Sequence, residues 1–355
     1  MNDRTRLIPA LASLAPQRQF QVSLTPHTLV VTEAGNALLE LTLQPGSQPD
    51  TLLGAIHPVE ACTEQHALLA ACEGAFSHYP GLQTLTFSAK PSPALASLVA
   101  SGLLNPAGPQ LYRCTAQALW QAPEPWLPKT SFAPPAQQYQ VTDGKRHPAR
   151  SAAQSSVVYR RFVPWVGQTL TFELADADRD LAHFNRWMNT PRVAHFWEEQ
   201  GSLAQHNAYL QKQLAAPHVL PLIGRFDGQA FGYFEVYWAK EDRIAPFYDA
   251  QDYDRGLHLL VGEEAFRGQA FYTAWFSSMC HYLFLDDART QRIVCEPRHD
   301  NQRQIANFDR SGFAKLKHFD FPHKRALLVM LTRERFFSDR LYQPLGNPTF
   351  QESAT

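Results

Sequence analysis

Cysteine is scarce in this 355-residue sequence, and its scarcity excludes two classes of protein. The five residues are scattered, and no two of them form a CxxC pair: Cys62, Cys72, Cys114, Cys280 and Cys295. Such an odd set argues against a disulfide framework and against a zinc site. We expect reduced core thiols and no metal, since histidine and cysteine are not grouped at ligand spacings.

An excess of either charge is also absent. The sequence has 32 Lys and Arg against 33 Asp and Glu, for a formal net charge of −1. Nucleic acid and anionic membrane surfaces are therefore not expected as partners. No stretch approaches the roughly 20 apolar residues that span a bilayer, and the first twenty residues lack the apolar segment of a secretory signal. These observations predict a cytoplasmic protein with small-molecule partners.

The length predicts two domains joined by a proline-rich segment. In residues 1–120, alternation and turn signals predict a small α/β domain. Six prolines within 121–156 predict a linker or wrapping segment, and we place a second domain at 157–340 and a tail at 341–355. The first domain is expected to contain strands 19–24, 28–32, 37–43, 82–88 and 111–119, and helices 66–78 and 93–101.

The second domain alternates strands and helices in a definite order. Asp176 is a plausible N-cap for a helix that stops at residues 189–191. Asp227-Gly228 between two apolar runs predicts a hairpin. The expected strands are 170–174, 219–225, 230–238, 257–261, 291–296, 316–319 and 326–332, and further helices are 203–214, 270–285 and 301–310.

The stretch from Tyr253 to Ala270 carries the clearest chemical signal. An apolar strand, 257–261, leads into a turn bracketed by Gly262 and Gly268, and a helix begins near Ala270. The free N–H groups at a helix N-terminus form an anion site. A nearby imidazole, His258, adds the capacity for acid–base chemistry. An ordinary strand–helix turn and a hydrogen-bonded core histidine are the plainer alternatives.

Five motifs in the same order resemble the siderophore-biosynthesis acyltransferases of the GNAT superfamily, nearest to the aerobactin N6-hydroxylysine acetyltransferases. They cover most of residues 157–337 and read FNRWMNTPRVAHFWEEQGS (184–202), PLIGRFDGQAFGYFEVYWAKEDRI (221–244), DRGLHLLVGEEAFRG (254–268), LDDARTQRIVCEPRHDNQR (285–303) and HFDFPHKR (318–325). The N-terminal domain is similar to this family more weakly, mainly around 112–127.

The resemblance implies an α/β (α+β) GNAT fold with a mixed central sheet flanked by helices. The smaller N-terminal α/β domain is considered as a degenerate GNAT-like half. The implied donor is acetyl-CoA or another short acyl-CoA, and the acceptor is an N-hydroxylated amine that becomes a hydroxamate. Acetyl and succinyl donors, and N6-hydroxylysine, N-hydroxycadaverine and N-hydroxyputrescine acceptors, all stay open, as does assembly into a homodimer.

For the coenzyme, the resemblance implies that the turn holds the CoA pyrophosphate. Gly268 and Ala270 fit the end of the usual signature, Gln/Arg-x-x-Gly-x-Gly/Ala, but Ala265 stands where Gln or Arg is usual. Arg267 is expected to supply the missing charge. The residues assigned to CoA are Leu260, Val261, Gly262, Arg267, Gly268, Gln269, Ala270 and Asn301; an N-cap is the alternative for Asn301.

For catalysis, His258 is expected to be the general base of a direct transfer in a ternary complex. An N-hydroxylamine is largely neutral near pH 7, and an imidazole with an ordinary pKa of about 6.5 suits removal of its proton. Asp300 is assigned as a second acid–base group or as the residue that orients the acceptor, with Glu296 and Arg298 as rivals. An acyl-cysteine at Cys280 or Cys295 is disfavoured, because both occupy core-like positions.

The acceptor needs aromatic walls and charges of both signs, because an amino acid carries an ammonium and a carboxylate. A structural salt-bridge cluster and ordinary core aromatics are the alternatives. The residues assigned to the acceptor are Trp187, Asn189, Phe196, Trp197, Tyr233, Glu235, Trp238, Lys240, Asp242, Arg243, Asp320, His323 and Lys324. Two other functions stay open: an aminoglycoside-type N-acetyltransferase and a non-catalytic acyl-CoA-binding module.

Overall fold

The computed structural model describes residues 6–10, 20–25, 27–48, 50–58, 65–79, 81–128, 134, 136–153 and 155–344. The chain divides into two compact units. Unit 1 comprises residues 1–130, 160–169 and 343–355, and unit 2 comprises 131–159 and 170–342.

In its described residues, unit 1 is built on an eight-stranded sheet of order β1-β2-β3-β4-β5-β6-β8-β7. The helix α1 (Gln65–His78) packs against β1 to β4, and α2 (Pro93–Ala100) and α3 (Ala116–Gln121) follow. Only the β5–β6 pair is parallel among the pairings of this sheet. The strands are β1 (Arg6–Ala10), β2 (Phe20–Leu24), β3 (Thr28–Glu33), β4 (Asn36–Pro45), β5 (Thr51–Pro58), β6 (Thr84–Ser88), β7 (Leu104–Gly108) and β8 (Leu111–Thr115).

The strand predicted over 111–119 is correct only in its first half. It stops at Thr115, whose hydroxyl accepts a hydrogen bond from Ala118 N at 3.1 Å and caps α3. A capping threonine satisfies a free N–H of the first helical turn, so the chain changes from strand to helix there. Three strands, β1, β5 and β7, were not predicted. In β5, Gly54 and Pro58 obscure the alternation, and β7 contains Pro106 and Gly108.

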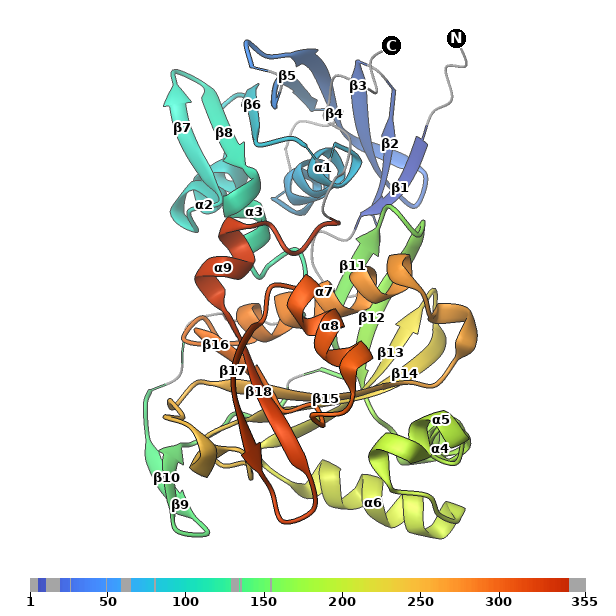
Figure 1. The fold of residues 1–355 in the computed structure, drawn as a ribbon. Helices are drawn as coiled ribbons and strands as arrows, with labels where there is room; N and C mark the ends of the chain where they lie inside the picture. Colours follow the sequence, from blue (N-terminus) through green and yellow to red (C-terminus); the bar gives the residue numbers. More distant parts are fainter. Residues whose placement is uncertain are drawn as a thin grey trace. The chain divides into compact units, whose positions relative to one another are not determined.

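The sheet of unit 2 has the order β11-β12-β13-β14-β15-β16-β18-β17 (Figure 1). Its β15–β16 pair is parallel, and β18 pairs antiparallel with both β16 and β17. The Asp227-Gly228 turn joins β13 to β14 as predicted, with positive φ at both residues. The strands are β11 (Val157–Val163), β12 (Gln168–Leu174), β13 (Val219–Phe226), β14 (Gln229–Trp238), β15 (Arg255–Val261), β16 (Arg292–Cys295), β17 (Ala314–Asp320) and β18 (Arg325–Thr332).

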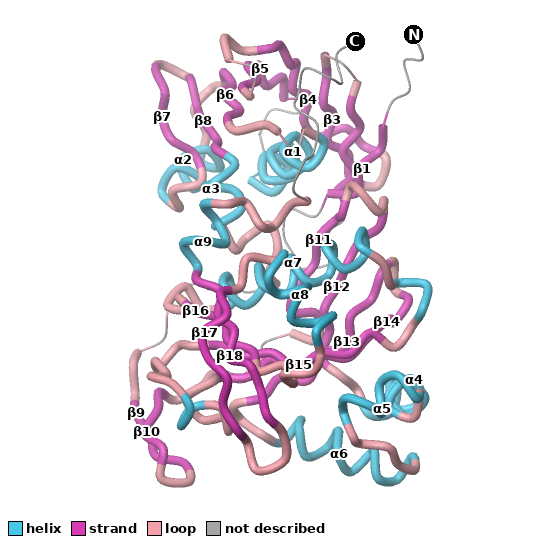
Figure 2. Tube along the Cα trace, viewed as in Figure 1, coloured by secondary structure: helices cyan, strands magenta, loops and turns pink. Residues whose placement is uncertain are grey.

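Helices fill the connections of this second sheet (Figure 2). Between β12 and β13, α4 packs against α5 and α6, and α6 packs against β13. Asp176 caps α4, as predicted, by accepting from the N–H groups of Asp178 and Arg179. The helices are α4 (Ala177–Met188), α5 (Pro191–Trp197), α6 (Leu203–Ala215), α7 (Gln269–Asp286), α8 (Gln302–Arg310) and α9 (Arg333–Ser338).

Two elements of unit 2 were not predicted because prolines hid them. Pro191 marks the predicted end of α4, but it also begins α5, where the missing N–H of a first-turn proline costs nothing. The proline-rich segment contains a hairpin, β9 (Tyr139–Thr142) and β10 (Lys145–Pro148). Asp143-Gly144, both with positive φ, forms its two-residue turn.

Two apolar clusters lie along β14 and leave a polar position between them. Tyr233 belongs to a cluster with Phe184, Trp187 and Leu260. Tyr237 belongs to a second cluster with Ile244, Phe319 and Phe321. Glu235, midway between the two tyrosines, is buried as well. Among the described residues, no helix combines the length and apolar character needed to cross a membrane.

Candidate active site

A cavity of about 970 Å³ opens in unit 2 where β15 and β16 part. The two strands pair only at Arg255–Ile293 and Gly256–Val294. Beyond these positions, residues 257–261 form one wall and residues 295–298 form another. The gap between the two parallel strands thus makes the middle of β15 accessible from the cavity.

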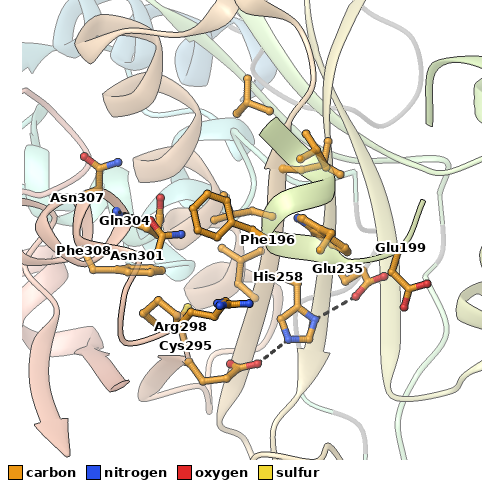
Figure 3. Close-up of a pocket in the computed structure, with 18 of the residues that line it drawn as sticks. Phe196, Glu199, Glu235, His258, Cys295, Arg298, Asn301, Gln304, Asn307 and Phe308 are labelled. Atoms are coloured by element: carbon orange, nitrogen blue, oxygen red, sulfur yellow. Dashed lines mark hydrogen bonds and ion pairs between the residues drawn. The ribbon is translucent and has the colours of Figure 1, made fainter. Parts of the chain in front are cut away.

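His258 lies in this cavity between two carboxylates. It sits opposite Glu235 in the β14–β15 register, and its Nδ1 is 3.0 Å from Glu235 Oε2. Its Nε2 is 2.7 Å from Glu296 Oε1. Figure 3 shows both interactions as dashed lines, one of them running to Glu235. A neutral imidazole has a single N–H and can donate to only one of two ionised carboxylates, whereas the imidazolium form donates to both.

Electrostatics favours the same protonation state. Burial alone would lower the pKa of His258, but Glu296 and Glu235 outweigh it and raise this pKa to about 9. Burial would raise the pKa of Glu296, yet His258, Lys324 and Arg243 bring it down to about 2. The pKa of Glu235 also falls, because the hydrogen bond and charge of His258 overcome the effect of burial. At neutral pH the site therefore holds a cation between two anions.

Three tyrosines fix the outer oxygens of these carboxylates. Tyr209 and Tyr233 donate to Glu235 Oε1 at 2.6 and 3.0 Å. Tyr237 donates to Glu296 Oε2 at 2.9 Å. Burial and the neighbouring carboxylates raise the pKa of each of these tyrosines, so their hydroxyls stay protonated and act as donors. The carboxylates are thereby held in place around the imidazole.

Two further cations stand beside Glu296. Arg243 NH2 is 3.3 Å from His258 Nε2 and 3.7 Å from Glu296 Oε1. Lys324 Nζ donates to the Glu296 carbonyl at 3.0 Å and lies 3.9 Å from Oε1. Burial lowers the pKa of Lys324, and Glu296 partly opposes that change. The cations come from the β14–β15 and β17–β18 connections.

The other end of β15 leads to the start of α7. Gly268 has a φ of 102° there, and no atom would lie within 4 Å of an added Cβ, so backbone conformation rather than space favours glycine. Arg267 and Arg192 pair with Glu264 at 2.6 and 3.1 Å. Burial and the positive charges of Arg267 and Arg303 lower the pKa of Arg192. The N–H groups in the first turn of α7 and the clustered guanidinium groups make this end suitable for an anion.

Most of the predicted site residues line the cavity together. Asn301 does so while its Oδ1 accepts from Gln304 N at 3.1 Å, so it is also the N-cap of α8. The predicted residues that line the cavity are Phe196, Trp197, Glu235, Asp242, Arg243, His258, Leu260, Val261, Arg267, Gly268, Gln269, Asn301, His323 and Lys324.

Several assigned residues lie outside the lining. Asp300 is about half exposed and binds the Arg298 side chain at 3.2 and 3.1 Å, whereas the carboxylate that contacts His258 is that of Glu296. Trp187 is core and donates to Glu263, and Tyr233 reaches the site only through Glu235. Three others bind elsewhere: Asn189 bonds Gly201, Lys240 bonds the Ala250 carbonyl, and Trp238 stacks with arginines. Gly262, Ala270 and Asp320 also lie outside the lining.

Sequence reasoning missed residues that the fold brings to the cavity from separate elements. Glu296 was named only as a rival, although a carboxylate directly after a buried strand was a usable signal. Tyr209 on α6 was not singled out, because a tyrosine on a helix is most often ordinary packing. Arg192, Arg303 and Gln304 were likewise missed on their helices.

Comparison with known proteins identifies the family. A model described as "Acetyltransferase (GNAT) domain" matches residues 176–321. An N(6)-hydroxylysine O-acetyltransferase from Escherichia coli is 46% identical over 62% of this chain and 70% of its own length. The chain belongs to the siderophore-biosynthesis acyltransferases of the GNAT superfamily. The predicted GNAT fold and acyltransferase class are confirmed.

Other similar proteins extend the comparison. An N(5)-hydroxyornithine:cis-anhydromevalonyl coenzyme A-N(5)-transacylase from Beauveria bassiana is 47% identical over 54% of this chain and 43% of its own length. A crystal structure of an uncharacterised Bacillus halodurans protein has 28% identity and a TM-score of 0.50, covering 53% of this chain and 96% of that protein. Within the described residues, no group of three or more His, Cys, Asp or Glu side chains could hold a metal ion.

Proposed function

We propose that this acyltransferase moves a short acyl group from coenzyme A to the hydroxylated nitrogen of an amine and so forms a hydroxamate. The observation that carries the proposal is His258, held between Glu235 and Glu296 in a cavity between two parallel strands. The names of the similar proteins, which include hydroxylysine and hydroxyornithine acyltransferases, support this class of acceptor.

The donor would lie along the gap between β15 and residues 295–298. The N–H groups at the start of α7 suit the pyrophosphate, and Arg192 and Arg267 supply positive charge beside them. Arg303 on α8 lines the same cavity. Acetyl-CoA is the donor proposed here, because the closely similar Escherichia coli protein is named as an acetyltransferase.

The contacts of His258 change how the base is assigned. A histidine that begins as imidazolium has no free lone pair, so it does not act alone as the base. The His258–Glu296 pair therefore takes this role as a unit. The attacking nitrogen forms its bond to the acyl carbon, and its proton passes to the carboxylate of Glu296, which His258 Nε2 contacts. The carbon–sulfur bond of the thioester then breaks, and the pair gives one proton to the departing CoA thiolate. The pair ends in its starting state, so each turnover balances.

The test is hydroxamate formation by the purified protein. Acetyl-CoA is supplied with N6-hydroxylysine, N-hydroxycadaverine or N-hydroxyputrescine, and the product is detected by its coloured iron(III) complex while thiol release is followed in parallel. We expect equal amounts of hydroxamate and thiol with at least one acceptor. Faster turnover of the matching plain amines would contradict the proposal and favour an ordinary amine acetyltransferase.

A further inference from the structure

The β9–β10 hairpin of the proline-rich segment contacts the connection between β14 and β15. It belongs to the same compact unit as the cavity. The connection, residues 239–254, carries Asp242 and Arg243, which both line the cavity. None of the hairpin residues lines the cavity itself. Residues 239–254 therefore link the hairpin to two residues of the cavity lining.

Lys145 binds this connection at Asp242, a residue of the cavity lining. Its Nζ donates to the carbonyl oxygens of Glu241 at 2.6 Å and Asp242 at 2.8 Å. Those carbonyls belong to the two planar peptide groups on either side of the Asp242 Cα. Because only the φ and ψ angles of Asp242 relate the two planes, fixing both carbonyls fixes the backbone at Asp242 and the direction in which Arg243 leaves it.

A buried ion pair adds a second attachment. Arg150 binds Glu241 with two hydrogen bonds, Nε to Oε1 at 2.6 Å and NH2 to Oε2 at 2.8 Å. The same NH2 donates to the Asp252 carbonyl at 2.7 Å, so Arg150 links both ends of the connection. The side chains of Arg150 and Glu241 are only 3% and 5% exposed. A buried bidentate pair of this kind is geometrically specific, and it is costly to break by removing one partner.

The connection and the phosphate turn lie at opposite ends of β15. Residues 239–254 precede Arg255, the first residue of the strand, and the turn to Gly268 follows Val261, its last residue. His258 is the middle residue of this seven-residue strand. With the CoA pyrophosphate at the turn, the acyl group reaches the strand's middle, and the opposite end is left for the acceptor. Asp242 and Arg243 are there, and Arg243 lies 3.3 Å from His258 Nε2.

We infer that Lys145 and Arg150 are positioning residues for the acceptor. Lys145 in the hairpin and Arg150 just after it hold Asp242 and Arg243 in place, so acceptor use depends on these two residues and acyl-CoA use does not. This inference rests on the proposed function for the identity of the acceptor. It gives the proline-rich segment a part in the chemistry of unit 2 beyond that of a linker.

The kinetic test compares Lys145→Met with Arg146→Met. Arg146 is on the same strand, but its guanidinium is exposed and stacks 3.6 Å over the Tyr139 ring, so it is a matched control. We expect Lys145→Met to raise the acceptor KM by about tenfold, to leave the acetyl-CoA KM unchanged, and to be partly rescued by Lys145→Arg. Arg146→Met should behave as wild type. Equal changes in both KM values, or none, would overturn the inference.

A second measurement does not require activity. Hydrogen exchange should show faster exchange of backbone amides in 239–245 of Lys145→Met, with amides in 262–272 unchanged. Lys145→Gln serves as a second variant if the first does not fold. Unchanged exchange in 239–245 would overturn the attachment, and faster exchange with an unchanged acceptor KM would overturn the role in acceptor positioning. If wild type makes no hydroxamate, the proposed function and the acceptor role fail, while exchange still decides the attachment.

Discussion

The two sheets share one strand order but differ at their parallel pair. In unit 1, β5 and β6 pair at five successive positions, from Thr51–Thr84 to Ala55–Ser88. In unit 2, β15 and β16 pair at only two positions before they part. The cavity lies in the gap left by that early separation. The same topology thus gives a closed sheet in one unit and an opening for a ligand in the other.

Both sheets also place a glutamate opposite a histidine on neighbouring strands. Glu40 faces His57 across β4 and β5, as Glu235 faces His258 across β14 and β15. His57, however, is exposed, while His258 is mostly buried and reaches a second carboxylate, Glu296. A cross-strand Glu–His pair does not make a catalytic site by itself. Unit 2 differs in two ways: β15 and β16 separate early, and a second carboxylate, that of Glu296, contacts the histidine.

The shared order supports the prediction that the N-terminal domain is a degenerate GNAT-like half, which stays a prediction. Each sheet has a helix between its parallel strands, α1 in unit 1 and α7 in unit 2. Unit 1 has no counterpart, in its described residues, of the α4 to α6 insertion, because β2 leads to β3 within a few residues. The described part of unit 1 therefore lacks an equivalent of α6, the helix that carries Tyr209.

The largest effect is expected from the two histidines. His258→Ala should lower kcat by at least about a hundredfold, because the proton-transfer group is lost. His57→Ala, the matching change in unit 1, should leave kcat unchanged. Steady-state rates of hydroxamate formation measure both. Similar losses of kcat from the two substitutions would contradict the claim that the early separation of β15 and β16 and the second carboxylate set the catalytic sheet apart.

A smaller effect is expected from the second carboxylate. Glu296→Gln keeps the size of the side chain but removes the charge that stabilises the imidazolium. We expect kcat to fall by only about tenfold, or roughly 1.4 kcal/mol in the barrier, because His258 then loses its ring proton more readily and can accept the proton itself. The pH at which the rate changes should also be lower in this variant than in wild type, because the pKa of His258 falls. Asp300→Asn is the control, since Asp300 does not line the cavity; a greater loss there would restore the original assignment.

A further effect is expected on the pH dependence of stability. The pKa of His258 is raised in the folded protein from 6.5 to about 9. The stabilisation from this shift is fully present below the lower value and is lost as the pH rises through the higher one. The Tm of wild type should therefore fall more steeply than that of His258→Gln between these two pH values. Parallel curves for the two proteins in thermal unfolding would contradict the imidazolium assignment.

Local signals allowed much of the fold to be predicted from the sequence. The Asp227-Gly228 turn and the Asp176 cap are fixed by neighbouring residues, and both predictions are confirmed. Partners that meet through tertiary structure were harder to predict. Glu296 and Asp300 are only four residues apart, and which one reaches His258 depends on where β16 ends and how the sheet opens. Lys145 contacts residues 96 and 97 positions away, which no local pattern reveals.

The most direct test of the account is an NMR titration of the His258 ring in the protein without substrate. The account predicts an imidazolium at neutral pH, with both ring nitrogens protonated and a pKa of about 9. His57, assigned by comparison with His57→Ala, provides a reference signal from unit 1. A neutral His258 ring at pH 7, with one bare nitrogen, would contradict the claim that two carboxylates hold a cation at the centre of the site.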